Sequence, residues 1–146
     1  MEKENYTTGT VLKVSDSSKR LPFIFHYGIV LNEGNGLHVA HNTPGKKNEH
    51  GGNIQIDTLK YWKRRRRIIE VTKTKLKTSQ ITNHIEQHKS KPFNIIFWNC
   101  EHFVFSLTKK RNYSPQLMFW VNIIVLFIII ATSIYKKTRL KKRLKL

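Results

Sequence analysis

Short hydrophobic runs alternate with polar, glycine-containing segments over the N-terminal part of the chain, which is the pattern of a small β-sheet. It predicts strands at residues 9–14 and within the apolar run 21–31. The sequence Asn-Glu-Gly-Asn-Gly at 32–36 is a turn signal, and the apolar pattern resumes at 37–40. A β-hairpin is therefore expected over residues 23–40.

Weaker patterns follow the hairpin. Residues 54–57 suit a brief edge strand and residues 68–72 a further strand. A short helix is predicted over residues 80–88, with Ile81 and Ile85 on its inner face and a preceding Thr or Ser as its cap.

A second helix is predicted to begin after Asn99, which is a good N-cap residue. Glu101 falls in its first turn, where the helix dipole favours an anion. Cys100, the only cysteine, heads an apolar stripe that continues through Phe103, Val104 and Leu107. Backbone N–H groups at a helix start stabilise a thiolate, so Cys100 is a candidate nucleophile. The simpler alternative is an inert, buried thiol.

Residues 117–135 are nineteen consecutive uncharged and mostly apolar positions. As a helix they span about 28 Å, close to the thickness of a bilayer core. Phe119, Trp120 and Tyr135 lie near the two ends, where interfacial aromatic residues belong. We expect a single transmembrane helix rather than a core helix, because a domain of this size cannot surround an all-apolar cylinder. The predicted organisation is a domain at 1–112, a linker at 113–116, the span, and a basic tail at 136–146.

The net charge is +18, and it is concentrated rather than diffuse. One cluster is the run Lys63, Arg64, Arg65, Arg66 and Arg67, and another is the tail. Such clusters suit anionic lipid or nucleic acid. Only Tyr61 and Trp62 accompany the run, which is thin aromatic interleaving for a single-strand binder, so lipid is favoured over nucleic acid. The polar N-terminus shows no cleavable signal, so the domain is expected in the cytosol, where a lone thiol stays reduced.

A nucleophilic cysteine needs a base within hydrogen-bond reach and a group that orients the base. His26 and His38 are the candidates. If residues 32–34 form a bulged turn, Leu31 pairs with Asn35, and His38 becomes a diagonal neighbour of His26 about 7 to 8 Å away on the same face. A two-residue turn at 35–36 would instead put them on opposite faces. We prefer the first register.

The remaining histidines are assigned elsewhere by position. His102 follows Cys100 by two residues along a helix and so points to another side. His41 has the opposite strand parity to His38 and is expected outside the site. His50, His84 and His88 lie in polar surroundings and are expected at the surface.

Three segments together resemble the lecithin:retinol acyltransferase (LRAT) domain family, and most closely its HRAS-like suppressor phospholipase/acyltransferase branch. They are His-Tyr-Gly-Ile-Val at 26–30, Leu-His-Val-Ala at 37–40 and Asn-Cys-Glu-His-Phe-Val at 99–104. Residues 9–14 resemble the first strand of that family, with Thr10 where Asp is usual. Members of the branch also tend to carry a C-terminal membrane helix.

The resemblance implies an α+β fold of circularly permuted papain-like type, with an antiparallel sheet packed on the helix that bears the cysteine. It implies Cys100 as the nucleophile, His26 as the general base and acid, and His38 as the residue that orients His26. The expected activity is cleavage of a glycerophospholipid ester through an acyl-Cys100 thioester, with transfer of the acyl group to water, an amine or a lysolipid. No cofactor is expected.

Three alternatives use the same residues differently. A papain-like thiol hydrolase would act on peptides or amides. A zinc site could draw on His26, His38 and Cys100, although the short paired spacings of zinc sites are missing. A non-catalytic, membrane-tethered adaptor would use the basic run for contact and the cysteine segment as scaffold.

Overall fold

The computed structural model describes residues 6–16, 25–34, 36–45, 53–64 and 66–143. It divides into two units, Met1–Ser114 and Pro115–Leu146. The first unit is an α+β domain, and the second is built around one long helix.

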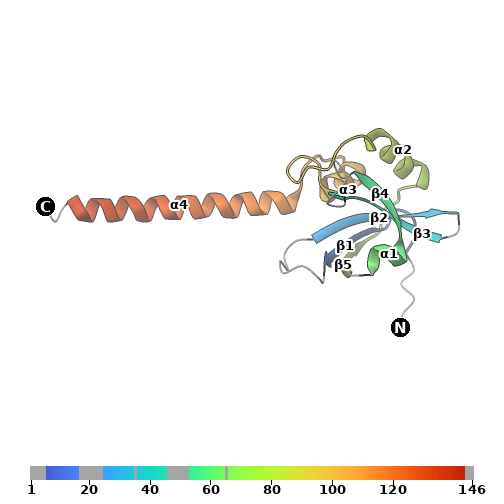
Figure 1. Ribbon diagram of the computed structural model, residues 1–146, viewed down its shortest axis with the longest axis horizontal. Helices are drawn as coiled ribbons and strands as arrows, with labels where there is room; N and C mark the ends of the chain where they lie inside the picture. Colours follow the sequence, from blue (N-terminus) through green and yellow to red (C-terminus); the bar gives the residue numbers. More distant parts are fainter. Residues whose placement is uncertain (1–5, 17–24, 35, 46–52, 65, 144–146) are drawn as a thin grey trace. The chain divides into compact units, whose positions relative to one another are not determined.

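Five antiparallel strands form the sheet of the first unit in the order β4-β3-β2-β1-β5. Strand β2 occupies the centre, and β4 and β5 are the edges (Figure 1). The strands are β1 (Val11–Asp16), β2 (Phe25–Glu33), β3 (Gly36–Asn42), β4 (Ile54–Thr58) and β5 (Arg66–Thr72).

Helices cover the sheet on both faces, because side chains alternate between the two faces of each strand. Helices α2 (Thr78–His88) and α3 (Cys100–Lys109) lie on one side, and the short α1 (Leu59–Lys63) lies on the other (Figure 1). The α3 side buries one apolar cluster that includes Ile29, Phe103 and Val104. The α1 side buries a second cluster around Trp62, which is 1% exposed.

The elements agree largely with the sequence-based expectations. The short strand expected at 54–57 is an edge strand, and both domain helices begin within a few residues of their expected starts. Positions 21–24 of the expected second strand lie outside the described residues. Helix α1 was not expected, because five residues are too few for an apolar periodicity to show.

The expected hairpin register is wrong. Glu33 pairs with Gly36 and Ile29 pairs with Ala40, so only two residues separate β2 from β3. Gly34, the first of them, has φ of +53°, a conformation that glycine adopts without a steric penalty. The register differs by an odd number of residues from the expected one, which exchanges the faces on which the residues of β3 lie.

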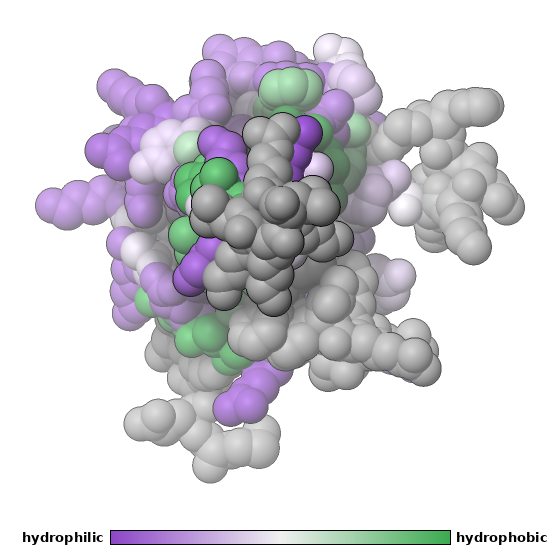
Figure 2. Space-filling view, turned by 90° about the vertical axis from the view of Figure 1, so that its left-hand side faces the viewer, coloured by the Kyte–Doolittle hydropathy of each residue, from purple (hydrophilic) through white to green (hydrophobic). Residues whose placement is uncertain are grey.

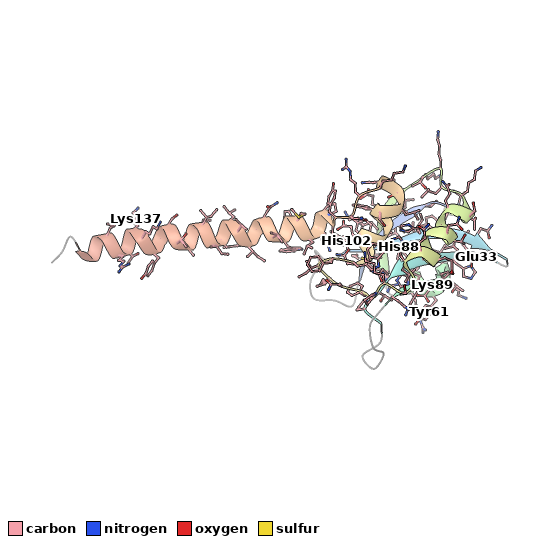
Figure 3. All side chains as sticks on the ribbon, turned by 90° about the horizontal axis from the view of Figure 1, so that it is seen from above. Glu33, Tyr61, His88, Lys89, His102 and Lys137 are labelled. Atoms are coloured by element: carbon pink, nitrogen blue, oxygen red, sulfur yellow. The ribbon has the colours of Figure 1, made fainter. Side chains whose placement is uncertain are left out.

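Helix α4 (Pro115–Arg143) forms the second unit. Its stretch Pro115–Leu140 is long and apolar enough to cross a membrane, and no part of that window is buried in the protein. The helix includes the predicted span and continues into the basic segment, where Lys137 is labelled in Figure 3.

Candidate active site

Asn99 fixes the start of α3 in the way that the sequence predicts. Its side-chain Oδ1 accepts hydrogen bonds from the backbone N–H groups of Glu101 at 2.9 Å and His102 at 3.0 Å. The ring of His102 turns back onto the same cap, with Nδ1 2.9 Å from Asn99 Oδ1. His102, labelled in Figure 3, therefore has a structural contact, as expected.

The thiol of Cys100 lies at this helix start, and Cys100 is only 9% exposed. The backbone N–H groups of Tyr27, Glu101 and Cys100 itself hydrogen-bond to the sulfur and favour its thiolate form. Burial outweighs them and raises the pKa of Cys100 to about 11. At neutral pH the group is therefore a thiol, and it needs a base to become a nucleophile.

The contact with Tyr27 locates Cys100 relative to the sheet. The N–H that faces the sulfur belongs to the peptide bond between His26 and Tyr27. Pairing of β2 with β3 begins at Ile29, so β2 residues before it have no partner on β3. The start of α3 therefore contacts β2 at Tyr27, in the part of β2 that is not paired with β3 and next to His26.

His26 belongs to a chain of three polar side chains drawn from three strands. Its Nε2 lies 2.9 Å from Nδ1 of His41 on β3. Nε2 of His41 lies 3.0 Å from Oδ2 of Asp57 on β4. The ring of Trp62 packs beside both imidazoles, with its centroid 6.0 Å from each ring centroid.

Hydrogen-bond logic assigns the protons along this chain. The carboxylate of Asp57 accepts, so His41 donates from Nε2. Burial is the main cause that lowers the pKa of His41, which is 2% exposed, so its ring is neutral and its Nδ1 is an acceptor. His26 then donates from Nε2, and in its neutral form Nδ1 is the basic nitrogen. The chain prepares His26 to take up a proton at Nδ1.

His38 does not join this chain. It pairs with Leu31 on β2 and with Thr58 on β4, and its Nδ1 lies 3.1 Å from the carbonyl oxygen of Gly36. His41, which was expected outside the site, occupies the place beside His26. The reason is the register, because residues of opposite parity on β3 face opposite sides of the sheet.

Glu101 connects the helix start to its surroundings. It is 3% exposed and accepts hydrogen bonds from the hydroxyl groups of Ser114 and Tyr27. The pKa of Tyr27 is raised far above its usual value, chiefly by burial and then by the charge of Glu101. Ser114 is the last residue before α4, so the chain leaves the domain at the first turn of α3.

Other predicted residues lie elsewhere. His84 and His88 are half-buried on α2 rather than at the surface, with His84 Nε2 3.0 Å from Ser106 Oγ and the His88 ring stacked on Trp98. His50 and Arg65 lie outside the described residues. Among the described residues, no group of three or more His, Cys, Asp or Glu side chains is placed to hold a metal ion.

Asp57 is the site residue that the sequence analysis missed. The sequence marks Asp57 only as a polar residue that alternates with apolar ones on a predicted edge strand. Such alternation is common wherever one face of a strand meets solvent. Comparison with known proteins adds no relative: no protein-family model matches the chain, and a search of curated proteins finds no match.

Proposed function

We propose that this protein is a membrane-anchored thiol phospholipase and acyltransferase of the LRAT type, with Cys100 as nucleophile and His26 as base. One observation carries the proposal. The thiol at the start of α3 contacts the peptide bond of His26, and His26 is held by His41 and Asp57 with Nδ1 as its basic nitrogen. Histidine strands that precede the cysteine helix are also the element order of a permuted papain-like fold.

The proposed chemistry requires the His26 ring, which lies beside Trp62 on the α1 face, to reach the Cys100 sulfur past the end of the β2–β3 pairing. His26 Nδ1 takes the proton of the Cys100 thiol, and the sulfur attacks the ester carbonyl of a glycerophospholipid. The backbone N–H group of Cys100 at the helix start stabilises the oxyanion. The bond from the acyl carbon to the glycerol oxygen breaks, and His26 protonates that oxygen, so a lysophospholipid leaves and an acyl thioester remains.

The second half releases the acyl group. His26 takes a proton from water, an amine or a hydroxyl group, which attacks the thioester carbonyl. The bond from carbon to sulfur breaks, and the thiolate recovers a proton from His26. In this scheme His41 replaces His38 as the orienting residue, and Asp57 holds His41.

Helix α4 supports the choice of a lipid substrate. Anchoring the domain in a bilayer through residues 115–140 raises the effective concentration of lipid at the thiol. The exposed Arg64 and Arg67 of the basic run are free to favour anionic headgroups. No cofactor enters the scheme.

The test is intact-protein mass spectrometry of the full chain after reconstitution with phosphatidylcholine that carries a labelled acyl chain. We expect one acyl adduct on Cys100, its loss in Cys100→Ala, and unchanged membrane association of that variant. Lipid turnover that persists in Cys100→Ala would overturn the proposal. An absence of adduct together with cleavage of peptide substrates would favour the peptide hydrolase, and an absence of both would favour the adaptor.

A further inference from the structure

Three large apolar side chains stand exposed in the loop that precedes α3. Ile95, Ile96 and Phe97 are 69%, 51% and 73% exposed. We call residues 95–97 the apolar tip. Consecutive exposed residues of this kind mark an interaction surface rather than the scattered exposure that is normal for soluble proteins.

The apolar tip is held in a fixed shape. Asn94 and Trp98 pair across its base, with N–H to carbonyl distances of 3.0 and 2.8 Å. The side-chain oxygen of Asn94 accepts hydrogen bonds from the backbone N–H groups of Ile96 and Phe97 at 2.9 and 3.0 Å. Backbone groups that are satisfied inside a loop lower the cost of placing the loop in an apolar medium.

The base of the tip is fastened to the domain. Trp98 is 2% exposed, and its ring lies between His88, 4.9 Å away, and the ammonium group of Lys91, 3.7 Å away. Asn99, the cap of α3, donates a hydrogen bond to the carbonyl oxygen of Ile95 at 3.0 Å. The tip is therefore a preorganised projection that needs no folding step to bind.

The connection of the tip to the residue that precedes α4 favours a bilayer as its partner. Through Asn99 it joins the first turn of α3, and Ser114, from which α4 departs, joins the same turn through Glu101. The apolar tip and the exit point of the apolar helix thus belong to one region of the domain. Lys91 adds a cation beside the tip, which suits an anionic headgroup layer. Hydrophobic surface also appears as separate green patches among hydrophilic residues in Figure 2.

We propose that residues 95–97 insert into the headgroup and acyl boundary of the bilayer that holds α4, so that the start of α3, which carries Cys100, faces the lipid. This deepens the proposed function and rests on its assignment of α4 to a membrane. A tether alone fixes distance from the bilayer, whereas a second contact also fixes the orientation of the domain.

The test measures depth of insertion and needs no catalysis. Phe97→Trp is made in full-length protein that also carries Trp120→Phe and is reconstituted in vesicles of phosphatidylcholine and phosphatidylserine. Tryptophan emission is then measured with lipids brominated at shallow or deep acyl positions. The emission of the Trp120→Phe background, which retains Trp62 and Trp98, is subtracted. The control is Glu33→Trp in the same background, because Glu33, labelled in Figure 3, ends β2 at the hairpin turn, at the opposite end of that strand from the contact between Tyr27 and Cys100.

We expect shallow-brominated lipid to quench Trp emission of Phe97→Trp at least twofold more than that of the Glu33→Trp control. Equal quenching in the two variants would overturn the insertion. A second variant, Ile96→Ser with Phe97→Ser, is expected to lower turnover of vesicle lipid about tenfold while leaving alkylation of Cys100 by a small water-soluble reagent unchanged. Strong quenching without any acyl adduct on Cys100 would uphold the insertion and refute the proposed enzyme function.

Discussion

The exchange of His38 for His41 beside His26 makes the sharpest prediction. His41→Phe keeps a planar ring in the buried position and removes both ring nitrogens, so it breaks the contact with His26 at 2.9 Å and the contact with Asp57 at 3.0 Å. His38→Phe is the matched control, since it makes the same chemical change three positions earlier on the same strand.

The magnitude follows from what the lost contact does. A buried hydrogen bond that orients a catalytic group is worth roughly 1 to 3 kcal/mol. Converted to a rate, this is about 5- to 150-fold. We therefore expect His41→Phe to slow acylation of Cys100 by one to two orders of magnitude, with the larger share in the rate constant of the chemical step. We expect His38→Phe to change it less than about twofold.

The assay is single-turnover acylation of full-length protein in vesicles, followed by mass spectrometry over a range of pH. Losing the proton acceptor of His26 Nε2 should also shift the pH at which the acylation rate is half-maximal, which a purely structural defect would not do. Circular dichroism of both variants checks the fold. Slow acylation of Cys100 in His38→Phe, together with normal acylation in His41→Phe, would contradict the role of His41. It would favour His38 as the residue that orients His26.

Three further predictions concern the start of α3 and the helix packed beside it. Asn99→Ala removes the acceptor of two backbone N–H groups and should lower the free energy of unfolding by about 1 kcal/mol in urea denaturation, and an unchanged midpoint would contradict the capping role. Alkylation of Cys100 should still accelerate above pH 9, because burial raises its pKa to about 11, and a plateau near pH 8 would contradict the burial. Burial lowers the pKa of His84 to about 4 from 6.5, so the stability due to its neutral form is complete above pH 6.5 and is lost as the pH falls toward 4. His84→Gln should flatten thermal stability over that window, and an equally steep dependence in the variant would contradict the assignment.

The features that sequence predicted well are those that depend on local chemistry. The cap at Asn99 needs only a short polar side chain before an apolar stripe, and its Oδ1 accepts hydrogen bonds from the first turn of α3 as expected. The helix α4 needs only length and apolarity, which one stretch of sequence supplies. Both are independent of how distant segments pack.

The register of the hairpin could not be predicted, because β3 carries histidines of both parities. His38 and His41 are separated by an odd number of positions, so either register brings one of them to the face of His26. Packing against Trp62, on the face that carries His26 and His41, favours the observed register. Gly28 lets Val39 and Trp62 approach β2, since a Cβ atom there would lie 2.4 Å from a Val39 methyl group and 2.9 Å from the Trp62 ring. That contact depends on α1, which the sequence did not reveal.

Trp62 also changes the interpretation of the basic run that follows it. The guanidinium of Arg66 donates to the carbonyl oxygen of Trp62 at 2.9 Å and lies 5.2 Å from its ring, and its charge helps to lower the pKa of His41. Arg66 thus packs on Trp62, the residue that lies beside His26 and His41, whereas Arg64 and Arg67 are exposed. The run is therefore not a uniform patch. Arg64 and Arg67 carry exposed charge, whereas the charge of Arg66 adds to burial, the main cause that lowers the pKa of His41. A neutral His41 is what leaves His26 with its basic nitrogen at Nδ1.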